Sequence, residues 1–295
     1  MVNSYDSCEI KWCTVNLSDV FSRGKRLEAS VFDVDAKKAH DAIVKGKYEA
    51  VNLYSDNGFV ANAHYGSRLR RNYVSKLNDK AVGFLGSSEM LDVRPSPVKF
   101  MVNDNKVDDL HVKLGTVLLS RSGTIGNVAF VGETLSKYLI SEHAIRLECR
   151  EFPGYVYAYL KTKTGKTIVC SNIYGAVIEQ IEPEHLSTVP IPNPPEEIKL
   201  KINDLIVKSF TLRDESNKLI DDATKLLTDE LKLPPIEKLE LDLYDQKASV
   251  ETYSVKLSNL KGRMDGSYHV PVVQAIIDRL KANAAEITHI GDKTI

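Results

Sequence analysis

The stretch from Glu196 to Leu231 limits the fold of this chain more than any other part of its sequence, because it contains neither glycine nor proline. Residues 192–197, Pro-Asn-Pro-Pro-Glu-Glu, supply a helix cap, prolines suited to a first turn and acids near the positive end of the helix dipole. Pro234 and Pro235 stop the helix at its other end. The predicted helix is about 54 Å long, which suits a spacer between separate parts of a molecule.

One face of this helix carries apolar residues at alternating steps of four and three, the spacing of a heptad seam. Ser209 and Ser216 interrupt the seam. The pattern therefore predicts pairing with another helix through a mixed interface rather than a self-sufficient zipper. The residues predicted to pair are Ile198, Ile202, Leu205, Leu212, Leu219 and Leu226.

Before the helix, short apolar runs alternate with turn residues, which is typical of strands in a mixed sheet or a distorted barrel. The predicted strands are 50–54, 82–85, 116–119, 127–131, 144–147 and 177–181. Apolar residues at steps of three and four predict helices over 35–44 and 155–163. We predict an α+β fold, with a mixed-sheet or barrel-like domain over 1–192 followed by a long coiled-coil-type helix over 193–233.

The last part of the chain, residues 234–295, is predicted to hold a linker and the start of a second copy of residues 15–53. Three blocks of similar residues recur in the same order, although identities are few and the match needs a short gap. The blocks are 15–18 with 255–258, 26–31 with 263–268, and 49–53 with 286–290.

Composition excludes several classes of protein. With 43% hydrophobic and 27% charged residues, the chain has an ordinary globular composition. No apolar run is long enough to span a bilayer and the first residues lack the basic start of a secretory signal, so a cytoplasmic location without a membrane partner is expected. The 4 cysteines form no CxxC pair, which predicts free thiols and no metal site. A net charge of -1 means that a nucleic acid would have to bind a local patch.

Three fragments resemble parts of enzymes, and each lacks something that the chemistry needs. Gly165-Lys166-Thr167 has no glycine-rich phosphate cradle before it. Asn193-Pro194-Pro195 is followed by Glu196 where an adenine methyltransferase loop has an aromatic residue. Ser120 to Gly126 offers serines among glycines, with His143 as the only nearby histidine, but no nucleophile elbow. No catalytic residue is therefore predicted.

Basic residues gather between positions 61 and 80, where 5 positive charges stand against Asp79 alone. Arginine forks bind phosphates or guanine edges, and interleaved aromatic residues add stacking faces, so this segment is predicted to contact DNA. The predicted contacts here are Arg68, Arg70, Arg71, Tyr73 and Lys76. A solvated polar loop is the alternative interpretation.

A second predicted group of DNA contacts surrounds Gly123 and Gly126, which allow the backbone to turn tightly and approach a ligand. It consists of Ser120, Arg121, Ser122 and Thr124, and a structural turn between two strands explains the same residues equally well. Lys163 could add a phosphate contact, although a lysine-rich exposed helix end accounts for it about as well.

Several motifs in order carry a resemblance to a known family: residues 118–126 (LLSRSGTIG), Tyr174-Gly175-Ala176-Val177, and Val189-Pro190-Ile191-Pro192 ahead of the long helix. The set resembles a target recognition domain of a type I restriction-modification specificity subunit with its spacer helix. The resemblance implies two such domains joined by antiparallel helices, each reading half of a split DNA target. It also implies that separate subunits methylate or cut.

The chain departs from that pattern, since it holds one complete domain, one helix and the opening of a second domain. Val31-Phe32 and Tyr268-His269 each differ from the aromatic pair expected there. A half-length subunit that dimerises through the helix and the N-terminal portion of a longer subunit are both compatible with this arrangement.

The expected function is sequence-specific recognition of double-stranded DNA by a non-catalytic subunit that positions methyltransferase, and also restriction, subunits. No cofactor is expected on this chain, because S-adenosylmethionine belongs to the methyltransferase subunit. The alternatives are a bifunctional or type II-like restriction-modification component with an unrecognised catalytic centre, and a protein scaffold that acts through its helix.

Overall fold

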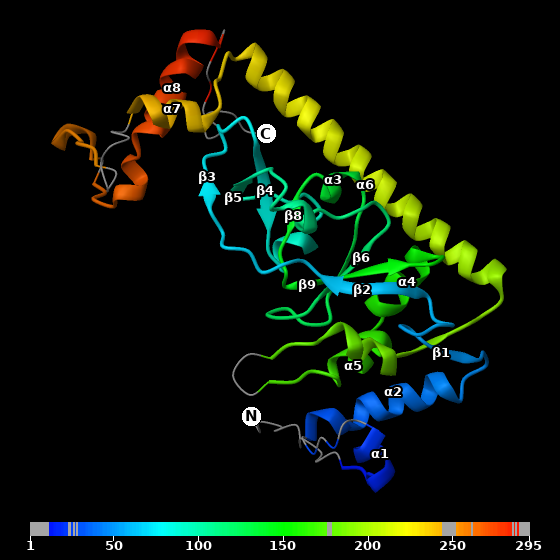
Figure 1. Ribbon diagram of the computed structural model, residues 1–295. Coiled ribbons are helices and arrows are strands. Elements are labelled where there is room, and N and C mark those ends of the chain that lie inside the picture. The colour runs from blue at the N-terminus through cyan, green and yellow to red at the C-terminus, as the bar shows by residue number, and fades with distance from the viewer. Residues whose placement is uncertain are drawn as a thin grey trace, which may run out of the picture. The chain divides into compact units, whose positions relative to one another are not determined.

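The computed structural model describes residues 12–22, 25, 27, 29–175, 179–243, 252–260, 262–284, 286 and 288 (Figure 1). The chain divides into two compact units. The first unit comprises Met1–Val74 and Lys80–Asp214, and the second comprises Ser75–Asp79 and Glu215–Ile295. This division falls inside the long helix, whereas the sequence analysis placed a domain boundary ahead of the helix, at residue 192.

The first unit is built on two four-stranded sheets and one short strand pair. The first sheet is antiparallel throughout, in the order β2 (Val60–Tyr65), β9 (Ala144–Cys149), β6 (Val117–Ser120), β7 (Val128–Phe130). The second has the order β3 (Tyr73–Val74), β5 (Lys99–Val102), β4 (Ala81–Leu85), β8 (Leu139–Ile140), with β4 and β8 parallel. The pair is β1 (Ala50–Asn52) with β10 (Pro190–Pro192).

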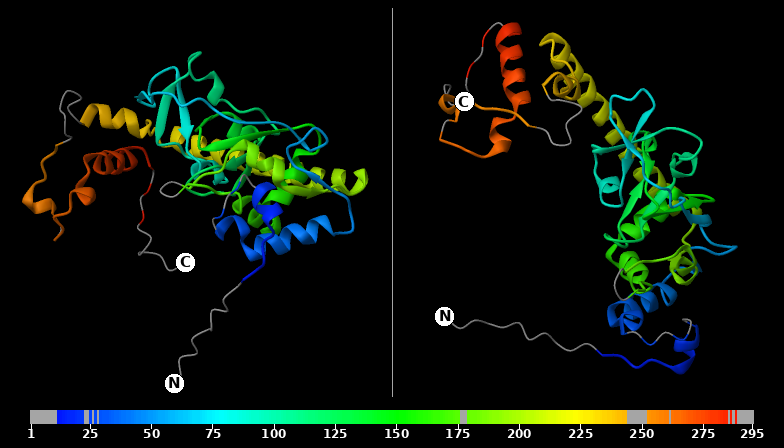
Figure 2. Two further views of the ribbon diagram at one scale, coloured as in Figure 1. Left: turned by 60° about the horizontal axis from the view of Figure 1, so that its bottom comes forward. Right: turned by 60° about the vertical axis from the view of Figure 1, so that its left-hand side comes forward.

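Helices surround these strands. They are α1 (Leu17–Ser22), α2 (Val34–Val44), α3 (Glu133–Ser136), α4 (Pro153–Lys161) and α5 (Lys163–Cys170). The carboxylate of Asp33 accepts from the Ala36 N–H and caps α2, which lies beside α5 in the views of Figures 1 and 2. The mixed α+β class that the sequence predicts is therefore confirmed.

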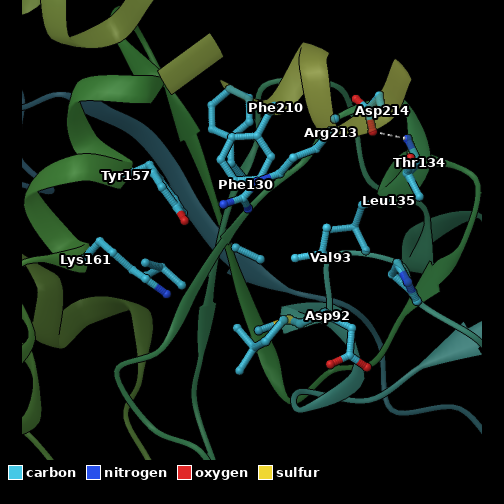
Figure 3. Close-up of a pocket in the computed structure, with 16 residues that line it drawn as sticks. Asp92, Val93, Phe130, Thr134, Leu135, Tyr157, Lys161, Phe210, Arg213 and Asp214 are labelled. Atoms are coloured by element: carbon cyan, nitrogen blue, oxygen red, sulfur yellow. Dashed lines mark hydrogen bonds between the residues drawn. The ribbon is translucent and has the colours of Figure 1, made fainter. Parts of the chain in front are cut away.

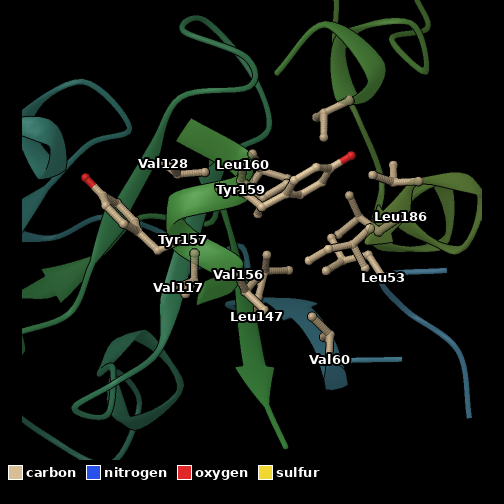
Figure 4. Packing of buried hydrophobic residues seen from close by; sticks show 14 of the residues in the cluster. Leu53, Val60, Val117, Val128, Leu147, Val156, Tyr157, Tyr159, Leu160 and Leu186 are labelled. Atoms are coloured by element: carbon tan, nitrogen blue, oxygen red, sulfur yellow. The ribbon is translucent and has the colours of Figure 1, made fainter. Parts of the chain in front are cut away.

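The core of the first unit lies between the β2-β9-β6-β7 sheet and helices α4 and α5 (Figure 4). Val117, Leu147 and Val156 have no exposed surface in this core. The hydroxyl of Tyr155 on α4 donates to the Pro192 carbonyl at 2.8 Å, which ties the core to the segment immediately before the long helix.

Most predicted elements appear with small shifts of their ends, and three differences have physical reasons. The predicted helix 155–163 is two helices, because Thr162 is extended and its hydroxyl accepts from the Gly165 N–H to cap α5. Part of the predicted strand 177–181 lies outside the described residues, and Gln180 makes only isolated bridges with Tyr174 and Ser122. The unpredicted strands β2, β3, β5, β8 and β10 are short or carry polar residues, so they have weak patterns.

The long helix α6 spans Glu196–Glu230, close to the predicted range. Its first part packs on the core through Ile202, Ile206 and Phe210, which recur every fourth residue. Ile202, predicted as a helix-pairing residue, is therefore part of the packing within its own domain. The other predicted residues, which recur at steps of seven and range from 38% (Ile198) to 64% (Leu226) exposed, form an apolar seam: Ile198, Leu205, Leu212, Leu219 and Leu226.

The second unit contains the latter part of α6 together with α7 (Ile236–Leu243) and α8 (Pro271–Asn283), which contact each other. Within the residues predicted to begin a second copy, two elements occur in the same order as in the first copy. The 3-10 helix Ala29–Phe32 and α2 match the 3-10 helix Gly266–His269 and α8, with one residue between the two elements in each copy. The third predicted block falls largely outside the described residues.

Among the residues that the structure describes, no helix is both long and apolar enough to cross a membrane.

Candidate nucleic-acid interface

The segment that follows β2 begins at a fixed point. Gly66 lies against the buried Arg146, where an added Cβ would come within 2.8 Å of Nη2. Arg146 itself is 3% exposed and donates to the Ile140 carbonyl at 2.9 Å. The backbone N–H and the hydroxyl of Ser67 both donate to Asp109, at 2.6 Å and 2.7 Å. Residues 66 and 67 are thus held by two side chains from distant parts of the sequence.

The Asp109 carboxylate is an effective anchor because it stays ionised. Burial alone would raise the pKa of Asp109, but the two hydrogen bonds from Ser67 and the nearby charges of Arg146 and His64 outweigh burial and hold the pKa below its ordinary value of 3.8.

Residues 67–73 are exposed apart from Leu69, which is half-buried. Leu69 packs on a buried cluster that includes Phe84 and Met101, whereas Arg68 and Arg70 are exposed. The packing of Leu69 therefore fixes the middle of the segment, between the two arginines. Among the residues that the structure describes, neither guanidinium has a hydrogen-bond or ion-pair partner.

Arg71 closes the segment. Its Nη2 lies 2.7 Å from Glu142 Oε1, and its guanidinium lies 5.1 Å from the centre of the Phe84 ring. Burial by itself raises the pKa of Glu142, but its backbone hydrogen bond, Arg71 and His143 together leave the pKa below its ordinary value. Exposed Tyr73 follows, with its ring 6.3 Å from that of Phe84. The structure therefore brings together Arg68, Arg70, Arg71 and Tyr73 on one segment pinned at both ends.

Glu142 and His143 connect this segment to the second predicted group. His143 Nδ1 lies 2.6 Å from the Ser122 hydroxyl, and His143 Nε2 lies 3.6 Å from Glu142 Oε1. Sequence reasoning found no place for Glu142, because nothing local in Ser141-Glu142-His143 indicates a partner 71 residues away. Ser122, His143 and Glu142 are connected in the order of a nucleophile, a base and an acid in a catalytic triad. However, Ser122 is only 8% exposed, which leaves little room for a substrate to reach its hydroxyl.

The glycine turn itself is structural in this conformation. Gly123 and Gly126 have φ of 75° and 78°, and the Ser120 hydroxyl lies 2.8 Å from that of Thr124. Arg121 is 1% exposed and is ion-paired with Glu182. Its guanidinium also donates to Gln180 at 3.0 Å and stacks 4.2 Å from the Tyr65 ring centre. Contact between Arg121 and DNA stays a prediction, and this buried position does not expose the guanidinium to a ligand.

The two predicted lysines are not part of this segment. Lys76 belongs to the second unit, where its amine is 2.7 Å from Glu237 Oε1. Lys163 is exposed in the first turn of α5. Near it, Lys166 reaches the Asn127 side chain of the glycine turn at 2.7 Å.

In the described part of the chain, no group of three or more His, Cys, Asp or Glu side chains is placed to hold a metal ion. Cys13, Cys149 and Cys170 are free thiols, and burial raises the pKa of Cys149 to about 12, so this thiol stays protonated at neutral pH. Cys8 lies outside the described residues.

The fold and this site define a class: a mixed α+β domain that displays a pinned cationic segment suited to a polyanion and continues into a spacer helix. Residues 98–223 match the family described as "Type I restriction modification DNA specificity domain". This part of the chain is therefore similar to that family of DNA specificity domains. No curated protein matches the chain.

Solved structures of low sequence identity also match. One is an S subunit of a type I restriction-modification system from M. genitalium, with 13% identity, a TM-score of 0.35, and coverage of 65% of this chain and 47% of that one. Another is an HsdS subunit from Thermoanaerobacter tengcongensis, with 16% identity, a TM-score of 0.38, and coverage of 67% and 48%. A chain from a study of the type I R-M system has 14% identity, a TM-score of 0.42, and coverage of 71% and 51%. The chain spans about half the length of the structures it matches.

Proposed function

We propose that this chain is a DNA sequence-recognition subunit of a type I restriction-modification system. The observation that carries the proposal is the segment 66–73, in which exposed Arg68 and Arg70 lie between the Ser67–Asp109 hydrogen bonds and the Arg71–Glu142 ion pair. The match of residues 98–223 to a family of DNA specificity domains supports it. The subunit binds double-stranded DNA at one half of a split target. It positions methyltransferase and restriction subunits and is itself non-catalytic.

The anchored segment suits recognition because binding requires little ordering of the backbone. Free arginines on a mobile loop would lose conformational entropy on binding, which weakens affinity. Here the Ser67–Asp109 and Arg71–Glu142 contacts already restrict the backbone of the segment. Both free guanidinium groups are therefore presented to DNA at a fixed spacing, and less entropy is lost on binding. Each fork can bind a phosphate or the O6 and N7 atoms of guanine.

The double variant Arg68→Ala/Arg70→Ala, reconstituted with its methyltransferase partner, tests the proposal. Loss of two phosphate contacts should reduce the slope of log K against log salt by about 1.8. Loss of a base contact should instead cost about 1–3 kcal/mol, mainly on the cognate sequence. A matched control is Lys38→Ala/Lys137→Ala, which removes two exposed positive charges elsewhere on the first unit. Unchanged affinity and unchanged methylated adenines in the arginine variant would rule out this segment as the recognition surface.

The apolar seam of α6 supports a second part of the proposal, pairing with another long helix in an antiparallel arrangement. Four leucines at steps of seven, Leu205, Leu212, Leu219 and Leu226, stand exposed along this helix. The partner helix belongs either to a second copy or to a matching half of the same assembly. The methyltransferase subunit, which holds S-adenosylmethionine, docks on the paired helices, and the assembly works in the cytoplasm.

The non-catalytic role has its own test. Purified chain incubated with labelled S-adenosylmethionine and DNA should transfer no methyl group, and adding the methyltransferase subunit should restore transfer. Methylation by the chain alone would instead favour the alternative of a bifunctional enzyme.

A further inference from the structure

A cavity of about 250 Å³ lies within the first unit, where α4, the β7–α3 connection and the first part of α6 meet (Figure 3). It lies outside the anchored arginine segment, and none of the residues discussed as DNA contacts lines it. Its lining falls into an aromatic wall, an apolar end and a group of polar side chains.

The aromatic wall is formed by three rings. Phe130 and Phe210 lie 5.0 Å apart between centroids, and the ring of Tyr157 meets Phe210 edge-on at 5.2 Å. Phe130 and Tyr157 are nearly buried, so these rings are held firmly. Leu135 and Val93 continue the apolar lining at the other side of the space.

Three hydrogen-bond donors face this wall. The Tyr157 hydroxyl and the Lys161 amine project from α4 toward the same open space as the Arg213 guanidinium from α6 (Figure 3). In the part of the chain that the structure describes, none of the three has a hydrogen-bond or ion-pair partner, although Arg213 stacks 4.7 Å from the Phe210 ring centre. Burial raises the pKa of Tyr157, an effect that Arg213 partly offsets, so the phenol is a neutral donor at physiological pH.

The lining also holds two acids, Asp92 and Asp214, and both lie away from Tyr157 and Lys161 (Figure 3). Asp214 accepts from the backbone N–H groups of Glu133 and Thr134 at 2.8 Å and 2.9 Å, so its carboxylate is used at the start of α3. Asp92 lies at the opposite end of the cavity from Lys161 (Figure 3). The end of the cavity near Tyr157 therefore carries the two cations, and the remainder is lined by apolar residues and the two carboxylates.

We propose that this cavity binds a small amphipathic anion, a carboxylate or a phosphate monoester attached to one aromatic ring. Lys161, Arg213 and Tyr157 hold the anionic group, and the ring packs between the aromatic wall and Leu135. The volume is somewhat below the roughly 300–1,000 Å³ of drug-sized ligand sites, which limits the ligand to about one ring. The donors come from both α4 and α6, so a bound ligand also links the first part of α6 to the rest of the domain. Ligand binding should therefore raise the melting temperature of the first unit.

Calorimetric titration of the full chain with phenyl phosphate and benzoate tests this site, with inorganic phosphate and neutral benzamide as comparison ligands. The aromatic anions should bind at one saturable site, at least about tenfold more tightly than either comparison ligand. Lys161→Met and Arg213→Met should each raise Kd about tenfold. Tyr157→Phe keeps the aromatic wall and should raise Kd by a smaller factor. Lys208→Met, which removes an exposed charge of α6 outside the cavity, should leave Kd unchanged.

Circular dichroism and thermal melting establish that each variant is folded, and Tyr157→Phe gives a readout even if a charge variant is unstable. Absence of saturable binding would overturn the proposal. Equal binding of inorganic phosphate and phenyl phosphate, or equal loss in the Lys208→Met control, would overturn it as well. No DNA or partner subunit enters the experiment, so its outcome is independent of the proposed function.

Discussion

At the residue scale, two carboxylates decide how the arginine segment is presented. Asp109 binds the N–H and hydroxyl of Ser67, and Glu142 binds the guanidinium of Arg71. The arginines that stay free, Arg68 and Arg70, lie between these anchors. The Arg71–Glu142 contact is partly buried, where hydrogen bonds to charged groups contribute about 1.5–3 kcal/mol, whereas the Ser67–Asp109 hydrogen bonds are exposed and contribute less.

Asp109→Asn should lower the free energy of unfolding of the first unit by up to about 1 kcal/mol, because a neutral amide accepts more weakly from Ser67 and solvent screens this exposed site. Urea unfolding measures the loss. Asp108→Asn is the matched control, because Asp108 is exposed and its side chain makes no hydrogen bond to any residue that the structure describes. A similar loss in both variants would show that the anchor is not specific to Asp109.

The dependence of folding stability on pH should reflect the ionisation of the Asp109 and Glu142 carboxyl groups. The pKa values of Asp109 and Glu142 are lowered by folding from their ordinary values of 3.8 and 4.5, so their contribution is complete at neutral pH and is lost as pH falls through the lowered folded values. The double variant Asp109→Asn/Glu142→Gln should therefore show a flatter fall of stability between about pH 5 and pH 2 than the unmodified chain. Parallel curves would contradict this assignment.

Ser122 tests the non-catalytic role. It lies in hydrogen-bond contact with His143, but it is nearly buried and the neighbouring Glu142 is bound by Arg71. A serine-directed fluorophosphonate should therefore leave Ser122 unlabelled in the intact chain, as measured by peptide mass spectrometry. Labelling that Ser122→Ala removes would indicate a reactive nucleophile and count against the proposed function.

At the element scale, α6 carries two apolar faces with different tasks. Ile202, Ile206 and Phe210 pack on the domain, whereas Leu205, Leu212 and the other seam residues are exposed. Charge on the first face should disturb the fold of the domain. Charge on the second face should disturb only association.

Leu212→Glu should therefore leave the melting temperature of the first unit nearly unchanged, because the side chain is 55% exposed, but should dissociate the assembly by burying an unpaired charge in it. Sedimentation velocity measures the assembly. Thr211→Glu adds the same charge at an exposed neighbouring position off the seam and should leave association intact. An unchanged assembly for Leu212→Glu would disprove the seam assignment.

At the scale of the whole molecule, the domain and the start of the helix form one compact unit that ends at Asp214. A fragment of residues 1–214 should unfold cooperatively, whereas residues 1–192 should be much less stable, since they lack Ile202, Ile206 and Phe210. Neither fragment should co-purify with the methyltransferase subunit if docking needs the paired helices. Capture of that subunit by residues 1–192 would place the docking surface on the domain instead.

The sequence by itself determined the features that depend on local pattern. A run without glycine or proline defines α6, apolar runs between turn residues mark β4, β6, β7 and β9, and recurring blocks indicate the repeat. These signals are readable because hydrogen bonding within a helix and alternation along a strand involve residues close in sequence. The arginine-rich segment is visible for the same reason.

Only the tertiary structure decided which polar and apolar side chains remain available. Arg121 and Arg70 look alike in sequence, yet Glu182 and Tyr65 enclose Arg121 while Arg70 stays exposed. Ile202 has seam spacing but packs on its own domain. The partners that make these distinctions come from strands and turns remote in sequence, and burial depends on how those elements pack, which no local periodicity encodes.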